Sequence, residues 1–214
     1  DLCRRVRQLD RLPFGADCTV KGVAHTTHGE PATAAWSLRS LERSADVTRL
    51  VLDMTMTKVP GRVTKTLALV EGHNAVYIRH LLEGCDARTS LGHHATLAGG
   101  EQPDALLLST SPLLFGRVAP RLPVTFESGG EYSALAAGAA FRSLERVPTV
   151  WKEMPTDSCA SFPRRRGFCD IIQLYNKPAA GPAWVAAVSA AAGWLWFALK
   201  DPADVVGHIQ VRRA

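Results

Sequence analysis

Apolar and polar residues alternate with a period of two along much of this chain, and this alternation most constrains its fold. In residues 47–57, leucine or methionine occupies every second position from Leu50 to Met56, with polar side chains at most positions between them. Residues 62–70 and 74–82 repeat the pattern, and glycine-containing turn sequences separate the three stretches. This alternation is typical of half-buried β-strands. We therefore predict neighbouring antiparallel strands.

The rest of the chain also favours short strands over helices. Only residues 132–141 suggest a helical turn, and residues 128–163 have the least regular pattern. Many short strands with Gly/Pro turns are typical of a sandwich or barrel, so we predict an all-β fold, a large antiparallel β-sandwich. Further strands are expected at residues 17–24, 34–41, 105–109 and 168–175, and in a hairpin of residues 184–189 and 194–199.

Charge and hydropathy argue against two classes of partner. The net charge is +5, but the only tight basic cluster is Arg164-Arg165-Arg166, whereas nucleic-acid-binding domains usually carry a continuous basic face. The apolar stretch 179–199 contains glycine, proline and many alanines, whereas a membrane-spanning helix needs about 20 strongly apolar residues. We therefore predict no nucleic-acid partner and no membrane partner. The sequence does not indicate an oligomeric state.

The cysteines lead to an expectation about the cellular compartment, and the chain ends lead to one about whether the domain is complete. Five cysteines without a CxxC spacing argue against a disulfide framework and against a cysteine zinc site. We expect reduced thiols in a cytoplasmic protein. The chain opens at Asp1 without an apolar signal region and stops abruptly at Ala214. We therefore expect one domain over residues 1–214 that is incomplete at both ends.

Four of the seven histidines, His25, His28, His93 and His94, occupy turn-like sequence between predicted strands. They either make structural hydrogen bonds, bind a metal, or form a metal-free acid–base site, because imidazole exchanges protons near neutral pH. His25-x-x-His28-x-Glu30 contains ligands acceptable to zinc or iron. However, residues three apart on a strand point to opposite faces. The metal-free acid–base site is the favoured interpretation.

Two histidine motifs follow one another at a characteristic separation. They are Thr27-His28-Gly29-Glu30-Pro31-Ala32 with Trp36 behind it, and Leu91-Gly92-His93-His94-Ala95-Thr96 after Leu82-Glu83-Gly84-Cys85-Asp86. Together they resemble the corresponding segments of the aldose 1-epimerases, the galactose mutarotase-like family. Residues 168–175, with Trp184 and Trp194-Leu195-Trp196-Phe197, are similar to the later hairpins of an uncharacterised branch of that family. The resemblance extends over residues 12–202.

The resemblance implies a galactose mutarotase-like supersandwich that binds a small-molecule sugar and needs no cofactor. In that family one histidine protonates the ring oxygen of a hexose while a glutamate takes the proton of the C1 hydroxyl. The ring opens, C1 rotates, and reclosure gives the other anomer. By motif position, His94 would be the general acid and His28 the sugar-binding histidine, both in the catalytic site. General acid–base pairs accelerate such proton transfers.

The chain departs from the family pattern at three points. Ala95 replaces a proline, His93 is an additional neighbour of His94, and the family's C-terminal glutamate has no counterpart here. Glu30 is the predicted substitute base. Two alternatives follow: a non-catalytic carbohydrate-recognition module without a general base, or a metal-dependent β-sandwich enzyme that uses His25, His28 and Glu30.

Further side chains are predicted to contact the sugar. Arg62 and Arg79 lie on predicted strands, and the planar guanidinium suits hydrogen bonding to hydroxyls, although an ion pair at the strand edge is the alternative for each. Trp151, in the irregular region, is the aromatic residue chosen for stacking on a sugar face. His25 and His93 complete the predicted substrate-binding set.

Overall fold

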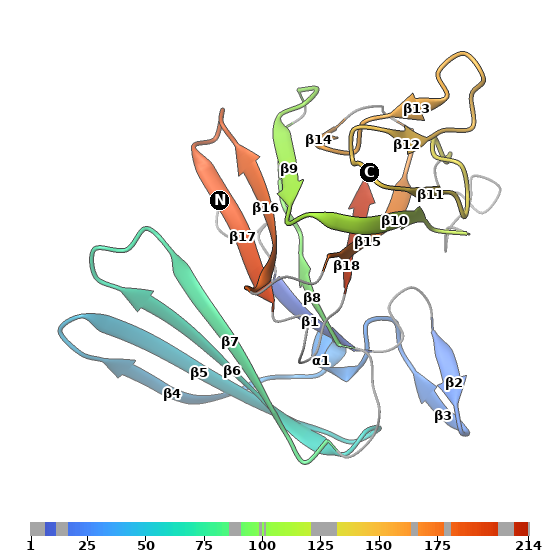
Figure 1. The fold of residues 1–214 in the computed structure, drawn as a ribbon. Coiled ribbons are helices and arrows are strands. Elements are labelled where there is room, and N and C mark those ends of the chain that lie inside the picture. The colour runs from blue at the N-terminus through green and yellow to red at the C-terminus, as the bar shows by residue number, and fades with distance from the viewer. Residues whose placement is uncertain are drawn as a thin grey trace. The chain divides into compact units, whose positions relative to one another are not determined.

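The computed structural model confirms an all-β protein whose strands pair antiparallel in every sheet of the described residues. The chain divides into two compact units, Asp1–Thr96 and Leu97–Ala214, which we describe separately (Figure 1). The large single sandwich stays a prediction. The structure describes residues 7–11, 17–85, 91–98, 100, 102–120, 132–163, 167–177, 181–200 and 208–213.

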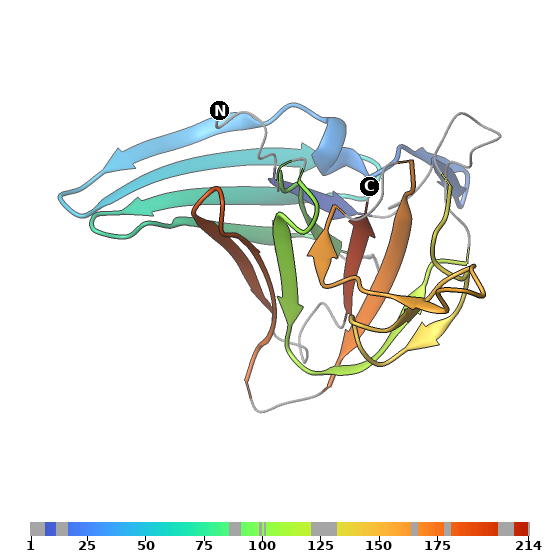
Figure 2. The same ribbon diagram turned by 90° about the horizontal axis from the view of Figure 1, so that it is seen from above.

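The first unit is built around a four-stranded meander in the order β4-β5-β6-β7, which forms a long curved sheet (Figure 1 and Figure 2). Two further pairs, β1–β8 and β2–β3, and the short helix α1 complete it. Its elements are β1 Arg7–Arg11, β2 Cys18–Val20, β3 Val23–His25, α1 Glu30–Thr33, β4 Ser37–Arg43, β5 Val47–Met56, β6 Gly61–Val70, β7 Val76–Glu83 and β8 Leu91–Ala95.

The alternation seen in the sequence produces one apolar face on the meander. In the register of β5 with β6, Met54 lies opposite Val63, so apolar side chains meet across the strands. Met54, Met56 and Val63 are buried and form the core of this unit, with Trp36 packed against them. Burial of such side chains stabilises the fold by about 1.5–3 kcal/mol each. The predicted strands at residues 47–57, 62–70 and 74–82 are thus confirmed.

The N-terminal predictions need correction. Residues 17–24 were expected to form one strand, but Lys21 and Gly22 both adopt positive φ angles, of 49° and 80°, and divide this stretch into β2 and β3. Two consecutive residues with positive φ are typical of a tight hairpin turn. The strand expected at 34–41 lies slightly later, as β4, and α1 was not expected at all.

The second unit contains two four-stranded sheets, ordered β14-β9-β16-β17 and β11-β10-β15-β18, and the small pair β12–β13. The predicted hairpin is confirmed as β16 and β17. Its strands are β9 Leu106–Thr110, β10 Leu113–Val118, β11 Ala140–Phe141, β12 Val147–Pro148, β13 Thr156–Asp157, β14 Ser161–Phe162, β15 Asp170–Asn176, β16 Ala183–Ser189, β17 Trp194–Lys200 and β18 His208–Arg213.

Two apolar clusters form the core of the second unit. One gathers Val118, Leu174 and Leu135, and the other gathers Val185 and Ala187 with their neighbours. Leu135 lies in the segment 132–141 that was predicted to contain a helical turn. That prediction is wrong, because the segment contributes two isolated bridges, of Tyr132 with Phe168 and of Leu135 with Thr149, and the short strand β11 instead.

A buried carboxylate positions the irregular segment that precedes β11. Asp170, at the start of β15, is only 1% exposed. Its Oδ1 accepts hydrogen bonds from the Ser133 hydroxyl at 2.8 Å, from the Ala134 amide at 3.1 Å and from the Leu135 amide at 3.0 Å. Buried polar groups are costly unless they are hydrogen-bonded, so this set fixes the loop backbone against the sheet.

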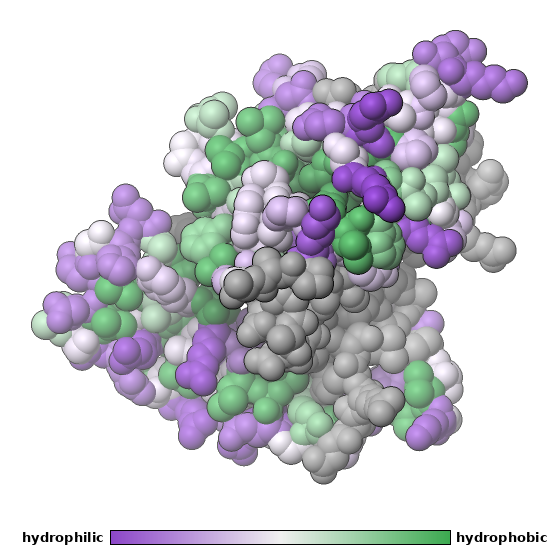
Figure 3. Space-filling model, in the orientation of Figure 1, coloured by the Kyte–Doolittle hydropathy of each residue, from purple (hydrophilic) through white to green (hydrophobic). Residues whose placement is uncertain are grey.

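Strand β17 is apolar on both faces. Trp194, Trp196 and Ala198 pack against the buried core, while Leu195 and Leu199 on the other face are 60% and 62% exposed. Figure 3 shows hydrophobic residues at the surface in this region. Among the described residues, no helix has the length and apolar character needed to cross a membrane.

Gly116 of β10 is required by close packing. A Cβ atom at this position would lie 2.3 Å from ring atoms of Phe141, whose ring covers the glycine. We expect Gly116→Ala to destabilise the protein by about 1–3 kcal/mol, because overpacking forces the buried ring to move. Urea denaturation measures this loss. Gly181→Ala is the matched control, since no described atom beyond its neighbours in the chain lies within 4 Å of the added methyl group. Equal stability of the two variants would contradict the packing argument.

Candidate functional site

The structure brings the two predicted histidine motifs together. The ring centroids of His28 and His94 are 5.3 Å apart, with an interplanar angle of 65° that gives an edge-on contact. His94 is exposed and lies within β8, where it pairs with Gln8 of β1. The prediction of a loop position for His94 is therefore wrong, but its proximity to His28 gives two imidazoles that can act on one small ligand.

His28 is held in an uncommon backbone conformation. Its φ angle is 66° and that of Gly29 is 73°, so two successive residues with positive φ form the turn between β3 and α1. The Gly29 amide donates to the Thr26 carbonyl at 2.9 Å, which closes the turn. Positive φ is uncommon in a residue other than glycine, and such strain concentrates at functional sites. The turn thus presents the half-buried His28 ring to His94.

The segment that leads into this turn is anchored by Asp17. Its Oδ1 accepts hydrogen bonds from the Thr27 amide at 2.7 Å and from the Thr27 hydroxyl at 2.8 Å. The backbone hydrogen bond and then the hydroxyl hydrogen bond lower the pKa of Asp17 below its ordinary value. The carboxylate form is therefore the one that holds Thr27, the residue before His28.

Glu30, the predicted substitute base, is engaged in a structural contact. It begins α1, and its carboxylate accepts hydrogen bonds from the Thr57 amide at 2.9 Å, the Thr57 hydroxyl at 2.8 Å and the Lys58 amide at 2.9 Å. Partial burial acts to raise the pKa of Glu30, but these hydrogen bonds outweigh it and the pKa is lowered. A carboxylate that accepts several hydrogen bonds is a weak base. We therefore assign Glu30 a structural role, in which it connects α1 to the turn between β5 and β6.

This contact predicts an acid-dependent loss of stability. Because folding lowers the pKa of Glu30, its contribution is fully present above the pKa of an unfolded glutamate, about 4.3, and is lost as pH falls through the lower folded value. We expect Glu30→Gln to reduce stability at pH 7 by about 1–3 kcal/mol and to flatten the decline below pH 4.3. Thermal unfolding at several pH values measures both effects. Parallel pH profiles for the variant and the parent protein would contradict this role.

His25 and His93 are the other two predicted site histidines, and His25 is also one of the three predicted metal ligands. His25 is half-buried at the end of β3, opposite Cys18, while the side chain of His93 lies outside what the structure describes. Among the described residues, no group of three or more His, Cys, Asp or Glu side chains is arranged to hold a metal ion. His25, His28 and Glu30 are all described, so the three-ligand metal site predicted as an alternative does not assemble.

Arg62 and Arg79 lie on the polar face of the meander. In the register of β6 with β7, Arg62 is opposite Glu83 and Arg79 is opposite Thr66, which places both arginines on the same face. Nη1 of Arg62 lies 3.8 Å from Oδ2 of Asp53. Arg62 thus forms the ion pair that was its alternative interpretation, and a sugar contact by either arginine stays a prediction.

Trp36 links the first histidine motif to the core of the meander. Its Nε1 donates to the Pro31 carbonyl at 3.2 Å, and Nζ of Lys65 lies 4.6 Å from the centroid of its ring. Burial lowers the pKa of Lys65. Lys65 was not predicted as a site residue, although it lies between Val63 and Leu67 on the apolar side of β6. This contact shields the lysine and supports Trp36 behind α1.

Trp151 belongs to the second unit. Its ring packs edge-on against Phe168, with centroids 5.5 Å apart and an interplanar angle of 73°. The Trp151 amide also donates to the Thr149 hydroxyl at 3.2 Å. These contacts give Trp151 a packing role within its own unit, and stacking on a sugar stays a prediction.

No protein-family model, no curated protein and no solved structure matches this chain. The function is therefore argued from the geometry of the site. What defines that site is the His28–His94 pair, the strained turn that holds His28 and the carboxylates of Asp17 and Glu30 that support the turn and helix α1.

Proposed function

We propose that this protein binds an aldose and interconverts its α and β anomers by acid–base ring opening at His28 and His94. The observation that carries the proposal is the 5.3 Å separation of the two imidazole rings. The exposed His94 is reachable by a ligand from solvent, and the half-buried His28 lies beside it.

In the proposed reaction His94 gives a proton to the ring oxygen of the sugar while His28 takes the proton of the C1 hydroxyl. The bond between C1 and the ring oxygen breaks as C1 becomes a carbonyl carbon. After rotation about the C1–C2 bond, the reverse transfers close the ring on the other face and restore both histidines. The step needs one protonated and one neutral imidazole, so that the pair supplies an acid and a base together.

A non-catalytic carbohydrate-recognition module is the second candidate. One observation favours it. Glu30 accepts hydrogen bonds from the backbone amides of residues 57–59, so it is engaged elsewhere, and no other described carboxylate is assigned as the base. Both candidates require a sugar at the histidine pair, and they differ only in turnover. The free thiol of Cys85 agrees with the proposed cytoplasmic location.

Sugar binding at the pair is tested by imidazole NMR signals during titration with galactose or glucose. Signals of His28 and His94, assigned with single His→Gln variants, are expected to shift together and to saturate. His73 is the matched control, because it is exposed in a turn, with Nδ1 2.8 Å from the Tyr77 hydroxyl oxygen. Unchanged signals, or equal shifts of all three histidines, would refute binding at this site.

A further inference from the structure

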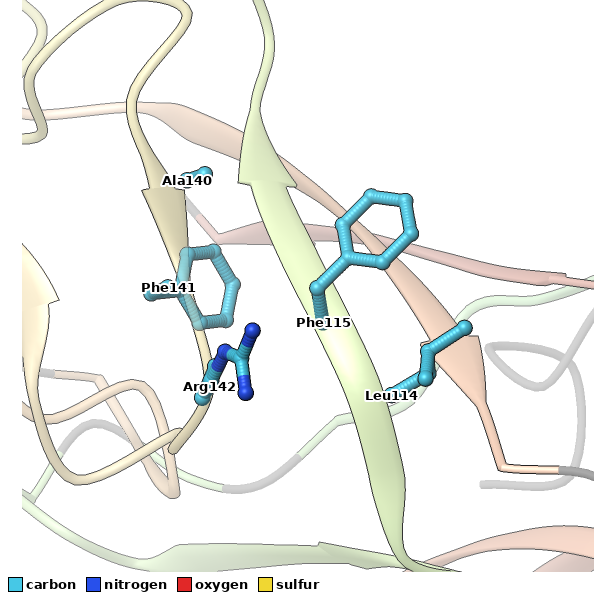
Figure 4. Close-up of a pocket in the computed structure, with 5 residues that line it drawn as sticks. All are labelled: Leu114, Phe115, Ala140, Phe141 and Arg142. Carbon is cyan, nitrogen blue, oxygen red and sulfur yellow. The ribbon is translucent and has the colours of Figure 1, made fainter.

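The second unit contains a small hollow between β10 and β11 that the proposed sugar site does not use. It is lined by Leu114 and Phe115 of β10, by Ala140 and Phe141 of β11, and by Arg142 (Figure 4). Its volume is about 290 Å³. Ligand pockets have volumes of about 300–1,000 Å³, so the hollow lies just below this range and suits only a small ligand.

Strand register places an aromatic pair on one face of this sheet. Gly116 lies opposite Leu174, a core residue, so the neighbouring positions Phe115 and Tyr175 point to the opposite, outer face. The rings of Phe115 and Tyr175 are stacked, with centroids 4.4 Å apart and an interplanar angle of 18°. An apolar or aromatic ligand therefore has a flat ring surface at the edge of the hollow.

Two arginines of the described residues bring positive charge to this surface. Arg142 is exposed, and among the residues that the structure describes its guanidinium makes no hydrogen bond or ion pair. Arg117 lies on the same outer face and donates from Nε to the Gly138 carbonyl at 3.2 Å. Strands β10, β11 and β15 contain one acidic residue, Asp170, and it is buried on the inner side. The outer face thus favours an anion.

We propose that the hollow binds a small aromatic carboxylate, with its ring against Phe115 and its carboxylate paired with Arg142. A guanidinium suits this ligand because it binds carboxylates through two parallel hydrogen bonds. An aldose is disfavoured here, because the apolar lining leaves most sugar hydroxyls without hydrogen-bond partners. This inference does not depend on the function proposed for the histidine pair.

Calorimetric titration of the full chain with benzoate, benzyl alcohol and acetate tests the proposal. Benzoate is expected to bind saturably. Benzyl alcohol, which lacks the carboxylate, and acetate, which lacks the ring, are expected to bind at least about tenfold more weakly. Arg142→Gln is expected to weaken benzoate binding about ten- to a hundredfold and to leave benzyl alcohol unchanged. Phe115→Leu should weaken both ring-containing probes.

Arg146→Gln is the matched control, because Arg146 is also exposed and does not line the hollow. It should leave benzoate binding unchanged. The proposal would be overturned by the absence of saturable benzoate binding, by benzoate binding that Arg142→Gln does not alter, or by equal binding of benzoate and acetate.

Discussion

Replacing Asp170 with alanine is expected to lower the free energy of unfolding by about 2–5 kcal/mol, the largest stability effect of any substitution described above. The carboxylate is 1% exposed, and its removal leaves the buried amides of Ala134 and Leu135 without their acceptor. Each unsatisfied buried group costs about 1–3 kcal/mol. The loss of this anchor should also release the segment that leads into β11.

Urea denaturation of three variants separates these contributions. Asp170→Asn keeps one acceptor oxygen and should be less destabilising than Asp170→Ala. Ser133→Ala removes one partly buried hydrogen bond and should cost about 0.5–1.5 kcal/mol. If Asp170→Ala unfolds within about 0.5 kcal/mol of the parent protein, a range typical of neutral surface substitutions, the anchoring role is wrong.

Replacing His94 with alanine is expected to reduce catalysed anomer exchange about 10²–10⁴-fold, the contribution typical of a general acid. His28→Ala should reduce the rate comparably, because each histidine moves one of the two protons. The rate of the parent protein should follow a bell-shaped pH profile, since the pair needs one protonated and one neutral imidazole. NMR exchange measurements on equal protein concentrations give all three results.

The exchange rates of the histidine variants can be compared only if each variant folds. His94 is exposed, so its truncation should leave the thermal unfolding midpoint nearly unchanged. His73→Ala, at an exposed turn position, is the control that should retain the parent rate. A His94→Ala variant that is folded and as fast as His73→Ala would remove His94 from the mechanism.

The parts of the fold that local patterns specify were predicted well. Strands β5, β6 and β7 follow from period-two alternation, and the β16–β17 hairpin follows from two apolar runs around Gly193, whose φ angle is 65°. In these cases the partner strand lies next in the chain. The alternation, the turn and the pairing are therefore all encoded within a short stretch.

Elements that depend on distant partners were missed. Strand β8, which carries His94, pairs with β1 at the other end of the first unit, so its sequence alone looked like a loop. The Lys21–Gly22 turn was overlooked because apolar residues lie on both sides of it. The motif order suggested that His28 and His94 act together, but their contact and the role of Glu30 depend on tertiary structure. Arg142 had no sequence signal, because its hollow arises from the pairing of β10 with β11.

The central claim is that this chain catalyses anomer exchange, and saturation-transfer NMR between the α and β anomers of galactose and glucose tests it most directly. Spectra with native protein, with heat-denatured protein and with buffer alone at one pH separate catalysis by the fold from general acid–base catalysis by the solution. We predict that only native protein accelerates the exchange. Equal exchange rates in all three samples, under conditions where the imidazole signals show bound sugar, would contradict catalysis and leave a carbohydrate-recognition module.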